Sequence, residues 1–261
     1  MILAALPVGF FAGLFGIGGG LISVPFLFFI FDYLNIDNQY LMHLSVGTAF
    51  SITIMTSSVS VITHNKHGVV DFNLLKTFGV FVVIGVIFGT FLASILKTKA
   101  LVLIFSIIVY FFGAYLLLVQ ENNKKKRIKF YTVPKFMCGF FSGFVSAPMG
   151  ITGAMINVPI LRYFGYPIKK AIGTSAAVGF IISLFGAIGF FTSGLILNAG
   201  LPLSIGFINI PAFLIFVPIT TYMARVGANT VHKMDKKKIQ RFFGLFLYII
   251  GTMFIYRFLS L

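Results

Sequence analysis

Apolar residues follow one another along this chain in long runs, and short polar segments separate the runs. A helix needs about 20 apolar residues to cross the hydrocarbon core of a bilayer, which is roughly 30 Å thick. The pattern therefore predicts an all-α integral membrane protein. The runs expected to cross as uninterrupted helices are residues 41–63, 72–96, 101–119, 171–191, 201–223 and 242–259.

The run over residues 2–31 is interrupted by a cluster of glycines. Four of the five residues from Gly16 to Gly20 are glycine, and each glycine in a helix interior costs about 1 kcal/mol relative to alanine. We therefore expect two half-helices, 2–15 and 18–31. Free N–H groups at the start of the second half must be buried in protein, line a wet cavity or bind a ligand. Their partial positive charge suits an anion.

The interrupted run occurs a second time, over residues 136–164. Its residues 150–159 align without a gap with residues 16–25, and the dipeptide Gly-Thr at 47–48 is found again at 173–174. We therefore predict two copies of one unit, each with a broken hairpin followed by three transmembrane helices, which makes eight membrane segments in all. The predicted units are repeat 1 over residues 1–119, a basic linker over residues 120–135 and repeat 2 over residues 136–261.

The basic residues distinguish two topologies. If all eight segments crossed fully, nine of the twenty Lys and Arg side chains would lie on one side and eleven on the other. If residues 136–164 instead enter and leave on the same side, as a re-entrant hairpin, seventeen lie on one side and three on the other. The positive-inside rule favours the second topology. It predicts that the linker 120–135 and the loop 225–241 face the cytoplasm.

By the repeat symmetry, residues 2–31 are expected to form a re-entrant hairpin from the opposite side. Each repeat then contains three full crossings, and an odd number of crossings inverts the second repeat relative to the first. Inverted repeats with broken helices are the plan of many secondary transporters, which bind their substrate near the bilayer midplane where the broken helices meet. The sequence therefore predicts a site between the two glycine-rich breaks.

Charge and composition narrow the function further. Only 10% of the 261 residues are charged, against about 25% in soluble domains. The basic residues that give the net charge of +15 lie in short loops between apolar segments, where the positive-inside rule accounts for them. The charge therefore does not indicate nucleic-acid binding. The single cysteine, Cys138, excludes a Cys-x-x-Cys metal or redox site. Since the sequence also has no catalytic Ser/His/Asp pattern and no His-Glu-x-x-His motif, we expect no enzyme activity, no cofactor and no metal site.

The candidate substrate-binding residues are glycines and polar residues at the two breaks and near the start of the following helix. Backbone N–H groups of the glycine clusters would bind an anion, although clustered glycines can also serve close helix packing. Ser23 and Asn157, at equivalent positions, would donate to the substrate or bond a carbonyl that the nearby proline leaves free. The other hydroxyls would bind substrate or their own i−4 carbonyl. The full set is Gly16, Gly18, Gly19, Gly20, Ser23, Thr48, Ser51, Gly150, Thr152, Gly153, Asn157, Thr174 and Ser175.

Several segments match a known family of membrane proteins: residues 9–13, 16–25, 47–48, His64 with 68–72, 150–159, 171–175 and 227 onward. In these segments the chain resembles the sulfite exporter TauE/SafE family, also described as toluene-sulfonate uptake permeases, and the resemblance covers essentially the whole chain. It implies a bacterial inner-membrane carrier of sulfite, sulfonates or other small anions. The second motif has Thr152 and Ala154 where the first has Gly18 and Gly20, so the two half-sites are not expected to be equivalent.

Together these features predict a secondary transporter that exports a small sulfur oxyanion, such as sulfite or an organosulfonate, by alternating access. Outward movement of an anion from a negative interior gains about 2.3 kcal/mol per charge per 100 mV, so export needs no coupling ion. Uptake would need one, and His43 is then the candidate proton carrier; otherwise His43 is a solvated or capping residue near a segment end.

Three alternatives stay open: an uptake carrier for another small organic anion, an ion channel, and a membrane scaffold that transports nothing. The expected partners are the small anion and the lipid bilayer, with no nucleic acid. A homodimer is compatible with the sequence.

Overall fold

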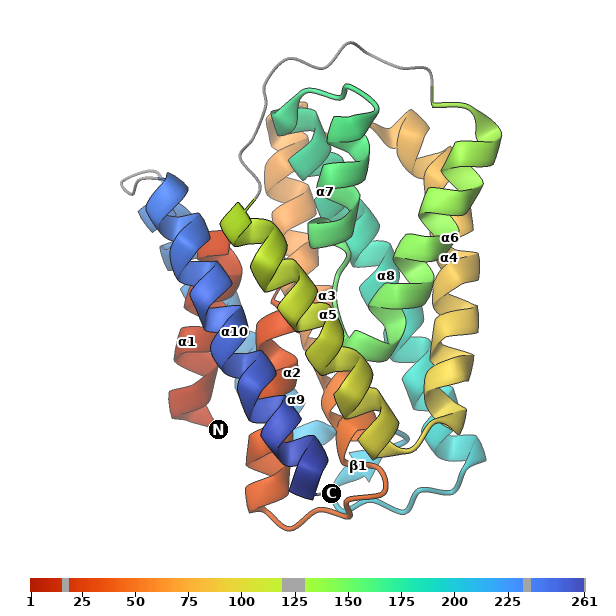
Figure 1. Cartoon of the computed structure of the whole chain (residues 1–261), viewed down its shortest axis with the longest axis vertical. Helices are drawn as coiled ribbons and strands as arrows, with labels where there is room; N and C mark the ends of the chain where they lie inside the picture. The colour runs from red at the N-terminus through yellow and green to blue at the C-terminus, as the bar shows by residue number, and fades with distance from the viewer. Residues whose placement is uncertain (16–18, 119–129, 232–235, 261) are drawn as a thin grey trace.

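The chain is helical over most of its length in the computed structural model (Figure 1), which describes residues 1–15, 19–118, 130–231 and 236–260. Within these residues one short antiparallel hairpin accompanies the helices, so the prediction of an all-α fold is confirmed. The elements are α1 (Ile2–Phe15), α2 (Gly20–Tyr33), α3 (Leu41–Lys66), α4 (Phe72–Ile95), α5 (Thr98–Leu118), α6 (Thr132–Met149), α7 (Ala154–Tyr163), α8 (Ile168–Ile196), β1 (Ser204–Ile205), β2 (Ile208–Asn209), α9 (Ile210–Val231) and α10 (Lys236–Ser260).

Six of the described helices are long and apolar enough to cross a membrane, namely α3, α4, α5, α8, α9 and α10. The helices that follow the two breaks are shorter. α2 has 14 residues and α7 has 10, and at 1.5 Å per residue they are about 21 Å and 15 Å long. Neither can span a core of roughly 30 Å. The chain is thus a multi-pass membrane protein in which α2 and α7 reach only part of the way across.

Both helical pairs next to the breaks turn back within the molecule. Figure 1 shows that α1–α2 begins and ends at the lower end, whereas α6–α7 begins and ends at the upper end. The end of α3 and the starts of α4 and α8 also lie at the upper end, which therefore carries Lys66, Lys76 and Lys169. We call this the basic end. Lys97 and Lys99, at the connection from α4 to α5, lie at the opposite end.

Helices from the two halves of the chain pack against each other. α1 lies against α9 and α4 against α6, while α3 pairs with α8 and α5 with α10. A Cβ on Gly13 would overlap a backbone carbonyl of α9, and a Cβ on Gly143 would overlap one of α4. Glycine is thus needed at these crossings for the helix backbones to approach. The buried core between the pairs includes the rings of Phe28 and Phe105, which both contact Phe254 in a tilted arrangement.

Each break ends in a glycine with positive φ. Gly19 (φ 92°) precedes α2 and Gly153 (φ 73°) precedes α7, a conformation that glycine adopts without a steric penalty. The predicted first half-helix, residues 2–15, matches α1, whereas α2 begins at Gly20 rather than at residue 18. The helix starts two residues later because the backbone of Gly19 is left-handed.

The structure differs from the predicted helix over residues 201–223. Residues Ser204 to Asn209 form the antiparallel hairpin β1–β2, and α9 begins only at Ile210. The side chain of Asn209 accepts a hydrogen bond from the N–H of Ala212 at 3.0 Å and so caps the helix. Pro211 then lies in the first turn of α9. A backbone N–H there would have no acceptor within the helix, so the proline removes no helical hydrogen bond. The proline starts this helix instead of interrupting it.

Candidate functional site

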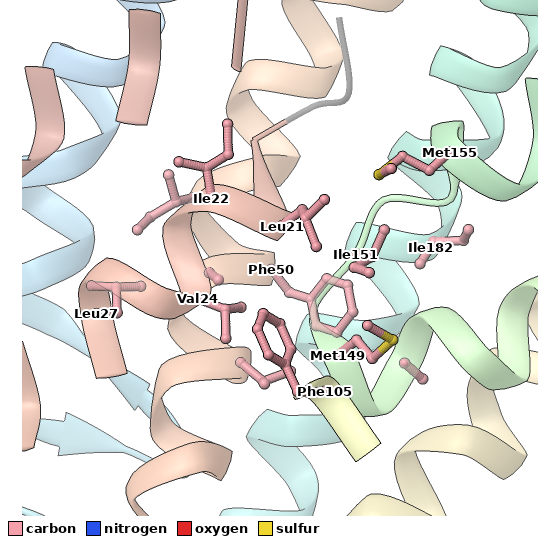
Figure 2. Close-up of a cluster of buried hydrophobic side chains, with 14 of the residues drawn as sticks. Leu21, Ile22, Val24, Leu27, Phe50, Phe105, Met149, Ile151, Met155 and Ile182 are labelled. Atoms are coloured by element: carbon pink, nitrogen blue, oxygen red, sulfur yellow. The ribbon is translucent and has the colours of Figure 1, made fainter. Parts of the chain in front are cut away.

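The two breaks meet inside the molecule. A Cβ on Gly20 would overlap the carbonyl oxygen of Gly150, and a Cβ on Gly150 would lie 2.6 Å from the side chain of Val24. The start of α2 therefore lies directly on the second break, and no larger residue than glycine fits between them. Figure 2 shows apolar side chains gathered around this contact, among them Leu21, Phe50, Met149 and Ile151.

The start of α7 presents two backbone donors. The N–H groups of Ile156 and Asn157 both bond the carbonyl oxygen of Gly153, at 3.1 Å and 2.7 Å. The N–H groups of Ala154 and Met155 have no acceptor within the described part of the chain. Donors at a helix start that the helix itself cannot satisfy carry partial positive charge and suit an anion.

The start of α2 repeats this arrangement. The N–H groups of Ile22 and Ser23 bond the carbonyl oxygen of Gly19, at 3.0 Å and 2.8 Å. Those of Gly20 and Leu21 find no acceptor among the residues that the structure describes. The start of α2 lies against Gly150 and Ile151 of the second break, so each break places two unpaired backbone donors at the start of a buried helix.

Asn157 and Ser142 add side-chain donors beside α7. Both residues are 0% exposed, and neither the Asn157 amide nor the Ser142 hydroxyl has a hydrogen-bond partner in the structure as described. A Cβ on Gly153 would lie 2.6 Å from Asn157 Nδ2 and 3.6 Å from Ser142 Oγ. Both polar groups therefore border the same glycine. Since buried polar groups are nearly always paired, an unpaired amide and hydroxyl at one place indicate a ligand site.

Ser142 is a candidate site residue that the sequence reasoning missed. It occupies the position in its motif, residues 139–143, that Ala12 occupies in residues 9–13. The replacement of an apolar residue by a hydroxyl between two otherwise matching motifs is the signal that would have identified it.

The first break is less polar than the second. The Ser23 hydroxyl donates to the carbonyl oxygen of Gly19 at 3.0 Å, so it is already paired within its own helix. A Cβ on Gly19 would meet the methyl group of Ala12 at 3.0 Å, where the second break has the hydroxyl of Ser142. The two half-sites therefore differ in their side-chain donors while sharing their backbone donors.

Thr48 and Thr174 hold loops at the two ends of the molecule. The Thr48 hydroxyl accepts a hydrogen bond from the N–H of Asn209 at 2.9 Å, and the Thr174 hydroxyl accepts one from the N–H of Asp71 at 3.0 Å. Asp71 and Asn209 in turn cap α4 and α9. Each threonine thus fixes the start of a helix that belongs to the other half of the chain.

The remaining candidates are distributed over several environments. Ser51 donates to the carbonyl oxygen of Gly47 at 3.0 Å and borders a cavity of about 310 Å³ that is otherwise lined by apolar side chains of α3, α8, α9 and β2. Ser175 is buried without a hydrogen-bond partner in the described residues. Thr152 is buried, and its carbonyl oxygen lies against Gly179 of α8. Gly16 and Gly18 lie outside the described residues.

His43 is buried in α3 at the end opposite to the basic end. Its Nε2 lies 2.9 Å from the carbonyl oxygen of Ala93 and so carries the proton, and its ring packs on Phe207 at 5.1 Å between centroids. Its Nδ1 has no partner among the described groups. In the part of the chain that the structure describes, no three His, Cys, Asp or Glu side chains come together as a metal site would require.

Comparison with known proteins gives consistent matches over the whole chain. The model of the family described as sulfite exporter TauE/SafE matches residues 1–254. A probable membrane transporter protein of Haemophilus influenzae is 28% identical over 255 residues, covering 96% of this chain and 95% of that protein. Another, of Methanocaldococcus jannaschii, is 27% identical over 252 residues, covering 96% and 92%. No solved structure matches the chain significantly.

Proposed function

This chain belongs to the sulfite exporter TauE/SafE family and is therefore a membrane transporter, and we propose that it exports a small sulfur oxyanion such as sulfite or an organosulfonate. The observation that carries this proposal is the group of buried, unpaired donors at the start of α7. They are the N–H groups of Ala154 and Met155, the amide of Asn157 and the hydroxyl of Ser142.

The number and type of these donors fit an oxyanion. A buried polar group without a partner costs about 1–3 kcal/mol, and a sulfite or sulfonate group has three oxygens that accept hydrogen bonds from several donors at once. The N–H groups of Gly20 and Leu21 at the start of α2, which lies against Gly150 of the second break, supply further donors in this proposal. The positive dipole end of a helix start favours an anion.

The described donors of the proposed binding region carry no fixed positive charge. Its donors are backbone amides, one carboxamide and one hydroxyl, and its neighbours are the apolar side chains of Leu21 and Ile151. A site that holds an anion only by neutral donors binds it less tightly than one with Lys or Arg. Such a site releases its substrate readily, which a carrier requires.

The mechanism that we propose is alternating access between two inverted repeats. The protein would lie in the bacterial inner membrane with its basic end facing the cytoplasm. This mechanism is supported by the two hairpins that enter from opposite ends and by the packing of α1 on α9 and of α4 on α6. Export agrees with the membrane potential, which favours outward anion movement by about 2.3 kcal/mol per charge per 100 mV.

Anion-dependent thermal stability of the purified protein tests the proposal. Sulfite, sulfate, thiosulfate, small sulfonates and small carboxylates are compared, because a ligand at 100 times its dissociation constant adds about 2.7 kcal/mol of stability. We expect stabilisation by the sulfur oxyanions and its loss in Ser142→Ala. Ser106→Ala is the matched control, since Ser106 is also fully buried but donates to the carbonyl oxygen of Val102 at 2.7 Å. Equal anion responses of the two variants, or no response of the unaltered protein to any sulfur oxyanion, would contradict the proposed site.

A further inference from the structure

One face of α3 carries polar side chains at helical spacing. Thr53, Ser57, Ser60 and His64 follow one another at intervals of four, three and four residues, which places them on the same side of the helix. The opposite side carries Met55 and, two turns on, Ile62, which are 45% and 57% exposed. In a membrane-spanning helix those exposed apolar side chains face lipid. We call the side with the four polar residues the hydroxyl face.

The hydroxyl face begins at the breaks. A Cβ on Gly19 would lie 3.8 Å from Thr53 Cγ2. One turn earlier on the same side, Phe50 belongs to the apolar cluster around the meeting point of the breaks (Figure 2). The inner side of α3 is thus apolar up to the breaks and polar from the breaks toward the basic end.

Ser57 has no hydrogen-bond partner on this face. It is 2% exposed, and its hydroxyl is unpaired within the described residues. Other serines of α3 behave differently: Ser45, Ser51 and Ser58 each donate to the carbonyl oxygen four residues earlier, at 2.7 Å, 3.0 Å and 2.7 Å. The Ser57 hydroxyl makes no such bond, so it remains free to bond a partner outside its own helix.

Exposure increases along the face toward the basic end. Thr53 and Ser57 are buried, while Ser60 and His64 are half-buried, and α3 ends at Lys66. Partly exposed polar side chains within a membrane line protein-enclosed water rather than lipid.

The equivalent face of α8 is closed. Aligning Gly47-Thr48 with Gly173-Thr174 places Gly179, Ser183, Gly186 and Phe190 opposite the four residues of the hydroxyl face. Ser183 donates to the carbonyl oxygen of Gly179 at 2.8 Å, and the Phe50 ring covers Gly186. Phe190 is 1% exposed. The face of α3 that runs from the breaks toward the basic end is therefore polar, whereas the equivalent four positions of α8 offer no unpaired hydroxyl.

We infer that the hydroxyl face of α3, residues Thr53, Ser57, Ser60 and His64, is the wall of a water-filled path along which the anion moves between the central site and the basic end. This inference rests on the proposed transport function and adds the route to it. Ser57, with its unpaired hydroxyl, is the first group on this route that offers a hydrogen bond to the departing anion or to its water.

Cysteine labelling tests the path. The native Cys138 is replaced by alanine, and Ser57→Cys, Ser60→Cys and the lipid-facing control Ile62→Cys are reconstituted into vesicles. The probe is sulfonatoethyl methanethiosulfonate, a membrane-impermeant reagent that is itself a small sulfonate. Asn65→Cys marks the basic end, because Asn65 is exposed at the end of α3. We expect labelling of Ser57→Cys and Ser60→Cys from the Asn65 side only, at rates more than about tenfold above Ile62→Cys, because the reagent needs a hydrated thiolate.

The outcomes separate the path from the proposed function. Rates at positions 57 and 60 that equal the rate at Ile62, or labelling only from the side opposite to Asn65, would overturn the path even if sulfur oxyanions stabilise the protein. Labelling as expected, with no thermal response to any anion and no protection of Ser57→Cys by a small sulfonate, would support a water-filled path and overturn the sulfur oxyanion as the ion that moves along it. Should Ser57→Cys fail to fold, Ser60→Cys decides alone.

Discussion

Asn157 is fully buried with neither amide atom bonded, whereas Ser23, at the equivalent position of the first break, bonds the carbonyl oxygen of Gly19. A carboxamide in such a place lowers the stability of the ligand-free protein, because its hydrogen bonds to water are lost on folding and not replaced. Residues of this kind are retained when function requires them.

Replacing Asn157 by leucine, which has a similar size, is expected to raise the free energy of unfolding of the ligand-free protein by about 1–3 kcal/mol and to abolish the thermal response to anions. Asn209→Leu is the control, because Asn209 is also buried but bonds Ser204, Pro202 and Ala212. It should destabilise the protein. Chemical denaturation in detergent measures the free energy of unfolding of both variants. Destabilisation by Asn157→Leu similar to that by Asn209→Leu would mean that Asn157 is a structural residue.

Gly153 allows a second test at the residue scale. Gly153→Ala places a methyl group 2.6 Å from Asn157 Nδ2 in a backbone with φ 73°, so it should cost stability and also displace the amide. Gly68 has φ 64° and no atom within 4 Å of its Cβ position. Gly68→Ala should therefore cost only the backbone strain, about 1–2 kcal/mol, and keep the anion response. Thermal scans with and without sulfite compare the two, and equal anion responses would argue against an anion beside Gly153.

At the scale of elements, the starts of α4 and α9 are fixed by threonines from the other half of the chain. Thr174 bonds the N–H of Asp71 and Thr48 bonds the N–H of Asn209. These bonds give the two threonines a structural role, although the Gly-Thr repeat suggested substrate binding. Each half of the chain uses its Gly-Thr threonine to hold a helix start of the other half, which explains why the dipeptide occurs twice.

Thr174→Val keeps the shape of the side chain but leaves the N–H of Asp71 without its partner. We expect a loss of about 1–3 kcal/mol in the free energy of unfolding and an unchanged apparent affinity for the anion. Thr77→Val is the control, because the Thr77 hydroxyl is exposed and bonds only carbonyls of its own helix. A drop in anion affinity at unchanged stability would instead place Thr174 in the binding site.

At the scale of the whole molecule, the basic residues at helix ends divide between two ends. Lys66, Lys76 and Lys169 lie at the basic end, and Lys97 and Lys99 lie at the other. By the positive-inside rule we propose that the basic end faces the cytoplasm. The Arg257–Asp32 ion pair, at 2.5 Å, ties α10 to α2, and Asp32 is near the end of α2 that Figure 1 shows at the lower end.

Sidedness is checked by labelling in intact spheroplasts. With Cys138 replaced by alanine, Lys97→Cys should react with an impermeant maleimide from outside, and Lys76→Cys should react only after permeabilisation. The reverse pattern would place the basic end outside and would remove the electrical argument for export.

Much of the element order could be predicted from local features. The limits of α1, α3 and α4 are close to the predicted 2–15, 41–63 and 72–96, because the length of an apolar run and its flanking polar residues act within the run itself. The hairpin β1–β2 could not be predicted in this way. Its residues are as apolar as a membrane helix, and the bond from Asn209 to Thr48, far away in sequence, holds it in place.

The sequence by itself determined that the protein lies in the membrane, that two glycine-rich breaks interrupt its helices, and that these breaks are the candidate site, because composition and glycine clustering act locally. Only the tertiary structure decided which polar groups at the breaks are free. Ser23 is bonded within its helix, whereas Asn157 and Ser142 are unpaired and border Gly153. Whether a buried group is paired depends on neighbours from other helices, and only the packing of the two halves supplies those neighbours.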